Sequence, residues 1–223
     1  MNTDRSATYL RLLEDLLRIL PAKLEESQLP IHILLESPFG ELNENQEELL
    51  GAARTAIEAA DIAVRRLRKL LDLERGAVSM TQQPMGVAEL LRAPLAIAAA
   101  RAEKAGVSYR WNVPIELPRV LIDPTHMPEA LTSQLGIAIA RTTPGQTLLV
   151  GAREVADGAR IAISLSHGDT ANGFTADALL ARRTIELQGG TITDGARATI
   201  IELPAERLST SMSTAARTSA QRG

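Results

Sequence analysis

The first third of the chain carries leucine and isoleucine in a repeat of seven residues. The recurring positions are Leu10, Leu17, Leu24 and Ile31, followed three residues behind by Leu13, Leu20 and Leu34. Both series fall on one stripe of an α-helix. The pattern predicts a helix over about residues 7–36, and the Ser-Pro-Phe-Gly segment at 37–40 ends it.

A second amphipathic helix follows. Asn43 and Gln46 have the spacing of a capping box, which predicts that the helix begins there. It ends near Gly76, since glycine commonly terminates helices. Its apolar stripe consists of Leu50, Ile57, Val64 and Leu71, with Ala53, Ala60 and Leu67 between them. Two long helices joined by a short loop predict an antiparallel hairpin.

The apolar face of the second helix is wider than one seam requires. A further row of apolar residues lies one position before each residue of the main stripe, namely Leu49, Ala56, Ala63 and Leu70. This width is typical of a four-helix bundle, which two copies of the chain would form. Packing of the hairpin on the rest of its own chain is the alternative. We favour the homodimer, because the sequence after Gly76 accounts for a core of its own.

From residue 77 short strands alternate with helices. The predicted helices span residues 85–105, 124–141 and 177–188. The predicted strands span residues 107–113, 148–152, 161–165, 191–193 and 198–203, with a turn at Asp157-Gly158. The fold class is therefore α+β: a long helical hairpin followed by a sandwich of helices on one face of a mostly antiparallel sheet. The expected domains are a hairpin at 1–76, a sandwich at 77–208 and a disordered tail at 209–223.

Composition narrows the function classes. The 223 residues are 45% hydrophobic and 23% charged, as in soluble globular proteins. Cysteine is absent and the three histidines are scattered, so we expect neither a disulfide nor a metal site. Nothing resembles a signal peptide or a membrane span, which predicts a cytoplasmic protein. A net charge of −3 and five aromatic residues argue against nucleic acid and leave proteins as the expected partners.

Three segments, in order, resemble a bacterial histidine kinase core. Residues 29–46 resemble the end of the phosphoacceptor helix with its hairpin turn, residues 70–76 the close of the second helix, and residues 184–192 the last helix and strand. The resemblance implies a dimerising hairpin followed by an ATPase-like domain of the GHKL type. Stand-alone histidine phosphotransferases of the same build are similar as well.

The resemblance also implies where a phosphoacceptor would lie. In the family a histidine, usually followed by an acid, lies five residues before a helix proline. If Pro30 is that proline, Glu25 occupies the place of the histidine and Glu26 that of the acid, which implies loss of phosphorylation. His32 lies seven residues beyond Glu25 on the same flank, about 10 Å along the helix. It is either a displaced phosphoacceptor or, as we favour, a surface histidine.

The nucleotide-binding motifs of the family are also altered under this resemblance. Ile137 occupies the place of an asparagine that binds magnesium, and Ser166 that of an aspartate that binds adenine. Thr175 and Asp177 occupy a glycine motif that cradles phosphates, and a carboxylate there would cap the helix and repel a triphosphate. We therefore expect no bound cofactor.

The sequence thus predicts a non-catalytic homodimer that binds a response regulator or a partner kinase through its hairpin. The expected partner-binding residues are Glu25, Glu26, Gln28, His32 and Arg68. Three alternatives stay open: a relay that carries phosphate on His32, a purely structural dimer, and a divergent active kinase or ATPase. The last of these would need metal contacts from Asp123, Asp169 and Asp177.

Four other side chains have structural interpretations. His126, in the first turn of a helix, and His167, in a loop, are expected at the surface. Tyr109 and Trp111 alternate on one strand and are expected to face the core together.

Overall fold

The computed structural model describes residues 2–36, 40–165, 175–195 and 197–205. Ser166, His167, Asp169 and the tail expected at 209–223 lie outside these ranges. The chain divides into two compact units, Met1–Val78 and Ser79–Gly223.

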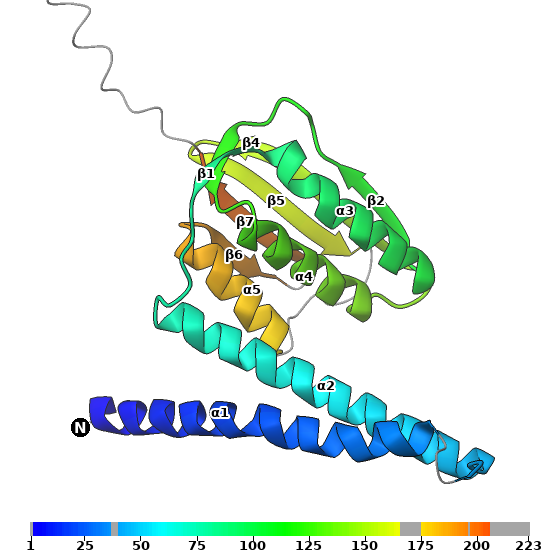
Figure 1. Ribbon diagram of the computed structural model, residues 1–223. Helices are drawn as coiled ribbons and strands as arrows, with labels where there is room; N and C mark the ends of the chain where they lie inside the picture. The colour runs from blue at the N-terminus through cyan, green and yellow to red at the C-terminus, as the bar shows by residue number, and fades with distance from the viewer. Residues whose placement is uncertain (1, 37–39, 166–174, 196, 206–223) are drawn as a thin grey trace, which may run out of the picture. The chain divides into compact units, whose positions relative to one another are not determined.

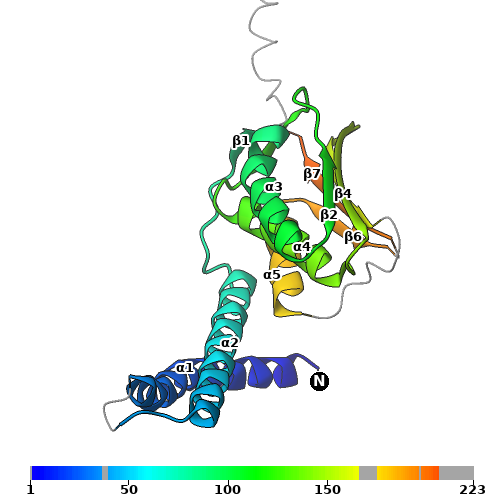
Figure 2. The same cartoon turned by 90° about the vertical axis from the view of Figure 1, so that its right-hand side faces the viewer.

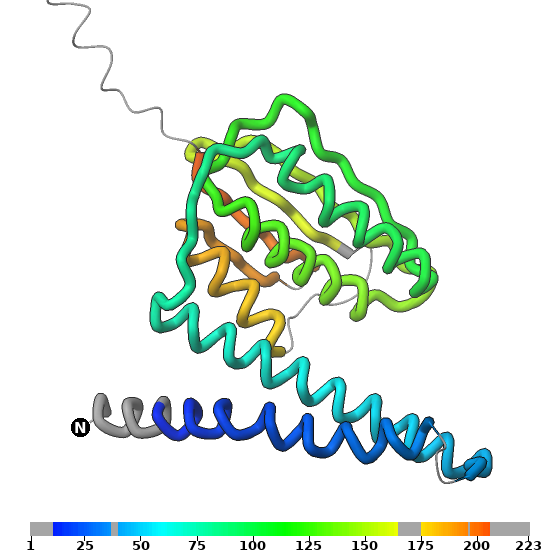
Figure 3. The backbone as a smooth tube through the Cα atoms, viewed as in Figure 1, coloured from blue at the N-terminus to red at the C-terminus, as the bar shows by residue number. Residues whose placement is uncertain are grey.

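The first unit is the expected helical hairpin. Helix α1 spans Asn2–Leu35 and helix α2 spans Glu44–Glu74, and the two lie side by side in opposite directions (Figures 1 and 3). The capping box is confirmed: Asn43 Oδ1 accepts from the Gln46 N–H at 2.9 Å, and Gln46 Oε1 accepts from the Asn43 N–H at 3.0 Å. Helix α1 begins earlier than the heptads alone indicated.

Leucine and isoleucine of the heptads divide between two faces of the hairpin. Leu17 is buried and Leu24 and Ile31 are half-buried, which places this series along the seam with α2. An ion pair between Glu14 and Arg75 also joins the two helices. Large apolar side chains remain exposed on the hairpin, namely Leu12, Leu13, Leu16, Ile19, Leu20, Leu29, Ile33, Leu34, Leu49, Ile62 and Leu67.

The second unit is the expected α+β sandwich. Its helices are α3 (Val87–Lys104), α4 (His126–Arg141) and α5 (Ala176–Leu187). Its strands are β1 (Gln83–Gly86), β2 (Ser108–Asn112), β3 (Arg119–Ile122), β4 (Thr147–Val155), β5 (Gly158–Leu165), β6 (Thr191–Asp194) and β7 (Ala198–Pro204). The order β2-β4-β5-β7-β6 makes one sheet, in which only β2 and β4 run parallel.

The three helices cover one face of this sheet, as Figure 2 shows from the side. Alternate residues of β7 are buried, so one face of the strand contributes to the core. The core between the helices and the sheet includes Leu91, Leu131, Ile161, Ile185 and Ile201. Gly158 opens β5 so close to the Leu203 carbonyl of β7 that a Cβ atom would overlap it, which requires glycine after the Ala156-Asp157 turn.

Two short strands were not predicted. Strands β1 and β3 pair antiparallel as a separate two-stranded sheet, with Gln83 opposite Ile122 and Gly86 opposite Arg119. Each has only four residues, and β1 contains Pro84, so the local strand signal is short in β3 and weak in β1. The expected helix start at residue 85 was wrong for this reason: α3 begins at Val87 after β1 ends.

The prediction that Trp111 belongs to the core was wrong. Its side chain is 55% exposed, although its partner across the sheet, Val150, is buried. The Trp111 side chain is exposed because β2 is an edge strand of the sheet and Trp111 lies near the end of that strand. Tyr109 is half-buried against the core, and its ring centroid lies 5.4 Å from that of Trp111.

Candidate functional site

The hairpin carries an open pocket between its two helices. It has a volume of about 320 Å³ and is lined by Glu25, Gln28, Leu29, His32, Arg54 and Glu58. The α1 residues lie three or four positions apart, so one helical flank presents them together. Helix α1 passes through Pro21 and Pro30 without ending, and this continuity keeps Glu25 and His32 on one helix.

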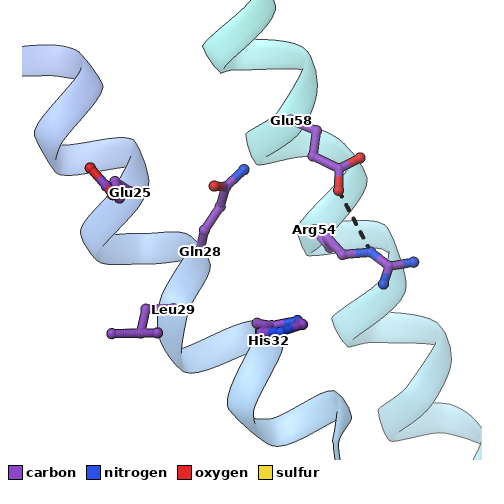
Figure 4. A pocket seen from close by; sticks show the side chains of 6 residues that line it. All are labelled: Glu25, Gln28, Leu29, His32, Arg54 and Glu58. Carbon is purple, nitrogen blue, oxygen red and sulfur yellow. Dashed lines mark ion pairs between the residues drawn. The ribbon is translucent and has the colours of Figure 1, made fainter.

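Five of the six side chains that line the pocket are polar or charged and most of them are exposed, although apolar atoms form most of the pocket surface. Arg54 and Glu58 on α2 form a loose ion pair at 3.8 Å, and Gln28 and His32 extend from α1 toward them (Figure 4). His32 Nε2 lies 3.1 Å from Glu36 Oε1, and its side chain is 64% exposed. Within the described part of the chain the Glu25 carboxylate makes no ion pair or hydrogen bond.

Three of the five expected partner-binding residues meet at this pocket: Glu25, Gln28 and His32. The other two do not line it. Glu26 pairs with Lys23 at 2.6 Å, and Arg68 is an exposed residue further along α2.

The sequence interpretation missed Leu29, Arg54 and Glu58. The spacing of four residues between Arg54 and Glu58 was a visible signal of an exposed helical pair. It did not say which residues of α1 lie opposite, because heptads leave the register between two antiparallel helices open.

A second polar cluster surrounds Asp123 at the start of α4. Its carboxylate accepts from the Thr81 N–H at 2.7 Å and from the Thr125 and His126 N–H groups at 2.9 Å. The ring of His126 meets the same carboxylate through Nδ1 at 2.9 Å. Burial alone would raise the pKa of Asp123. The hydrogen bonds, of which those from His126 have the largest effect, outweigh burial and lower the pKa to about 2.

The cluster corrects the interpretation of His126 as a simple surface residue. Its side chain is only 19% exposed and is held by the buried Asp123. The Asp123 N–H donates to Gln188 Oε1 at 2.6 Å, so the cluster also joins the end of α5. In the described residues no group of three histidine, aspartate or glutamate side chains could hold a metal ion.

Comparison with known proteins identifies the architecture. No protein-family profile matches the chain, and no curated protein matches it. Among solved structures, the histidine kinase AdeS of Acinetobacter baumannii is 14% identical with a TM-score of 0.60, covering 84% of this chain and 96% of its own. Full-length ShkA, solved with AMPPNP, is 19% identical with a TM-score of 0.65, and the match covers 87% of this chain and 45% of ShkA. The cytoplasmic segment of histidine kinase QseC is 15% identical with a TM-score of 0.50, over 65% of this chain and 94% of its own.

The chain has the fold of a histidine kinase core. In this kinase-type fold the hairpin precedes an α+β layer, and both parts were expected from the sequence. No helix within the described ranges has the length and apolar character to cross a bilayer.

Ile137 and Asp177, two positions at which the sequence predicted altered nucleotide-binding motifs, lie on helices. Ile137 is half-buried on α4, and its hydrocarbon side chain offers no oxygen to a cation. Asp177 lies in the first turn of α5 but does not cap it, contrary to expectation. The cap is Thr175, whose Oγ1 accepts from the Ala178 N–H at 3.1 Å.

Proposed function

We propose that this chain is a non-catalytic, homodimeric signalling protein that binds a response regulator or a partner kinase of a two-component pathway through its hairpin. The pocket between α1 and α2 carries the proposal. It brings the side chains of Glu25, Gln28 and His32 together on the part of a kinase-type fold that precedes the α+β layer.

The chemistry of the pocket supports recognition of a protein. Charged and amide groups from two helices surround an open surface, with Leu29 as an apolar contact. Such a surface offers complementary charge and hydrogen bonds to a partner. Glu25, which has no partner within the described ranges, would meet a donor on the bound protein without breaking an existing pair.

Loss of catalysis is supported by the residues at three positions. A carboxylate at Glu25 is a poor substitute for a nucleophilic imidazole, since glutamate would give an acyl phosphate rather than a phosphohistidine. Ile137 supplies no ligand for magnesium. The Thr175 hydroxyl already occupies the Ala178 N–H at the start of α5, which removes one donor from any phosphate cradle.

Dimerisation is supported by the exposed apolar side chains of the hairpin. Soluble monomers rarely expose large contiguous apolar patches, and such patches mark interaction surfaces. Leu13, Leu16 and Leu20 lie three or four positions apart on α1, so they share one face. A second hairpin packed on this face would complete a four-helix bundle.

The partner half of the proposal is tested with purified receiver domains of response regulators from the source organism, screened for binding to the full chain. We expect at least one to bind with micromolar affinity. We expect Glu25→Lys to weaken this binding at least tenfold, because it reverses a charge in the pocket. Glu48→Lys makes the same change at an exposed site of α2 outside the pocket and should leave binding unchanged. Equal loss in both variants would contradict the assignment of the site.

The catalytic half is tested by calorimetric titration with magnesium and ATP and by incubation with γ-labelled ATP. We expect neither heat of binding nor label on the protein. Micromolar ATP binding would favour a divergent active kinase instead. Incubation with a phosphorylated receiver domain completes the test, because stable label on His32 would favour the phosphate relay.

A further inference from the structure

The second unit contains a histidine whose ring is held by a buried carboxylate. His126 Nδ1 lies 2.9 Å from Asp123 Oδ1, and the Asp123 side chain is 7% exposed. These residues do not line the hairpin pocket that carries the proposed function. Chemistry at His126 is therefore independent of that pocket.

The surroundings of Asp123 decide which nitrogen of His126 carries the proton. The carboxylate accepts three backbone N–H groups, from Thr81, Thr125 and His126, and these keep it ionised. An ionised carboxylate can only accept hydrogen bonds. The Nδ1 of the neutral imidazole therefore bears the proton and donates it to Asp123, and the lone pair lies on Nε2.

Within the described part of the chain, Nε2 of His126 has no hydrogen bond or ion pair. Part of the side chain remains accessible to solvent. In its neutral form the ring thus has its lone pair on Nε2, a fixed orientation and a carboxylate that stabilises positive charge on the ring. These are the requirements for an imidazole nucleophile.

His32 is held less firmly. Its Nε2 lies 3.1 Å from Glu36 Oε1, but within the described part of the chain no hydrogen bond fixes the tautomer of its ring. The pair is exposed and weakly held, so the ring of His32 is also free to turn.

We propose that Nε2 of His126 is a phosphoryl-accepting modification site. The Nε2 lone pair attacks phosphorus and forms an N–P bond, while the bond from phosphorus to the donor's leaving group breaks. With phosphoramidate the P–N bond breaks and ammonia departs with the electron pair. With an acyl phosphate the P–O bond breaks and a carboxylate departs. The ring loses no proton, because Nδ1 keeps its proton against Asp123.

The test uses phosphoramidate as the donor and the intact chain at neutral pH. Label at each histidine is followed over time by mass spectrometry of peptides, and phosphorus NMR identifies the nitrogen. We expect His126 to be labelled several-fold faster than His32, on Nε2, although His32 is more than three times as exposed (64% against 19%). His126→Gln should abolish this label and His32→Gln should leave it unchanged. Faster labelling of His32, or an unlabelled His126 in folded protein, would overturn the proposal.

Asp123→Asn tests the role of the carboxylate. We expect slower labelling of His126 in this variant while labelling of His32 stays the same. If the variant does not fold, nitrogen NMR of the unmodified protein replaces it. That spectrum should show the His126 proton on Nδ1, and a proton on Nε2 would refute the proposal.

Discussion

Asp123 is a charged side chain that the fold buries and then surrounds with donors. Thr81 reaches it from the segment before β1, and Thr125 and His126 from the start of α4. The sequence showed an aspartate before a helix. It did not show the contact with Thr81, which lies 42 residues away in the chain.

The pKa of Asp123 makes its contribution to stability dependent on pH. Its pKa is about 2 in the folded chain and about 3.9 in an unfolded one. The folded value is the lower, so the stabilisation is complete above about pH 4 and is lost as pH falls toward 2. We expect denaturant unfolding between pH 2 and 7 to show an acid loss of stability that is smaller in Asp123→Asn, which should also be less stable at neutral pH. Asp157→Asn, at an exposed turn, serves as the control, and acid profiles identical to wild type in both variants would contradict this account.

Ile137 and Trp111 differ in how much the residue type alone predicts. Ile137 excludes a side-chain oxygen ligand at its position whatever the fold, because its side chain has no polar atom. The exposure of Trp111 depends on the sheet order, since the same strand in the centre of the sheet would have buried it.

The start of helix α2 is determined by residues that are close together in the sequence. Asn43 and Gln46 satisfy each other's backbone donors, and nothing beyond four residues is involved. This is why the sequence predicted the start of the helix correctly.

We expect Asn43→Ala to lower the free energy of unfolding by about 1 kcal/mol, the typical value for loss of a helix cap. Equilibrium denaturation monitored by circular dichroism measures this effect. Glu48→Ala, one turn further along and exposed, is the matched control and should have a smaller effect. An equal loss in both variants would mean that the cap contributes little.

Strands β1 and β3, in contrast, depend on a contact between residues that are distant in the sequence. Each is four residues long, and each exists because the other lies beside it. Their pairing joins residues as far apart in the sequence as Gln83 and Ile122, and no local pattern specifies such a contact. The two strands therefore became visible only in the folded chain.

More large apolar side chains are exposed on the described part of the hairpin than on that of the sandwich. Leu16 and Leu20 on α1 are among its exposed large side chains, whereas the sandwich buries most of its own. The hydrophobic effect favours covering such a surface, and a second chain is the simplest cover.

We expect light scattering to give the mass of two 23.9 kDa chains for the unmodified protein. The double variant Leu16→Glu with Leu20→Glu should give one chain, because it places charge in the proposed bundle core. Leu149→Glu, at a similarly exposed leucine of the sandwich, should remain a dimer. A monomeric unmodified protein at tens of micromolar would refute the homodimer.

The sequence by itself determined the helical hairpin, the cap of α2, the α+β class and the hydrocarbon character of the side chain at position 137. These follow from periodicities, short-range hydrogen bonds and side-chain chemistry, which are properties of residues close together in the chain. Only the tertiary structure decided that Arg54 and Glu58 join Glu25 and His32 at one pocket, and that Asp123 holds His126. The register between two helices and the burial of a charge depend on contacts between residues that are distant in the sequence. These contacts form only when the chain folds, so no local pattern predicts them.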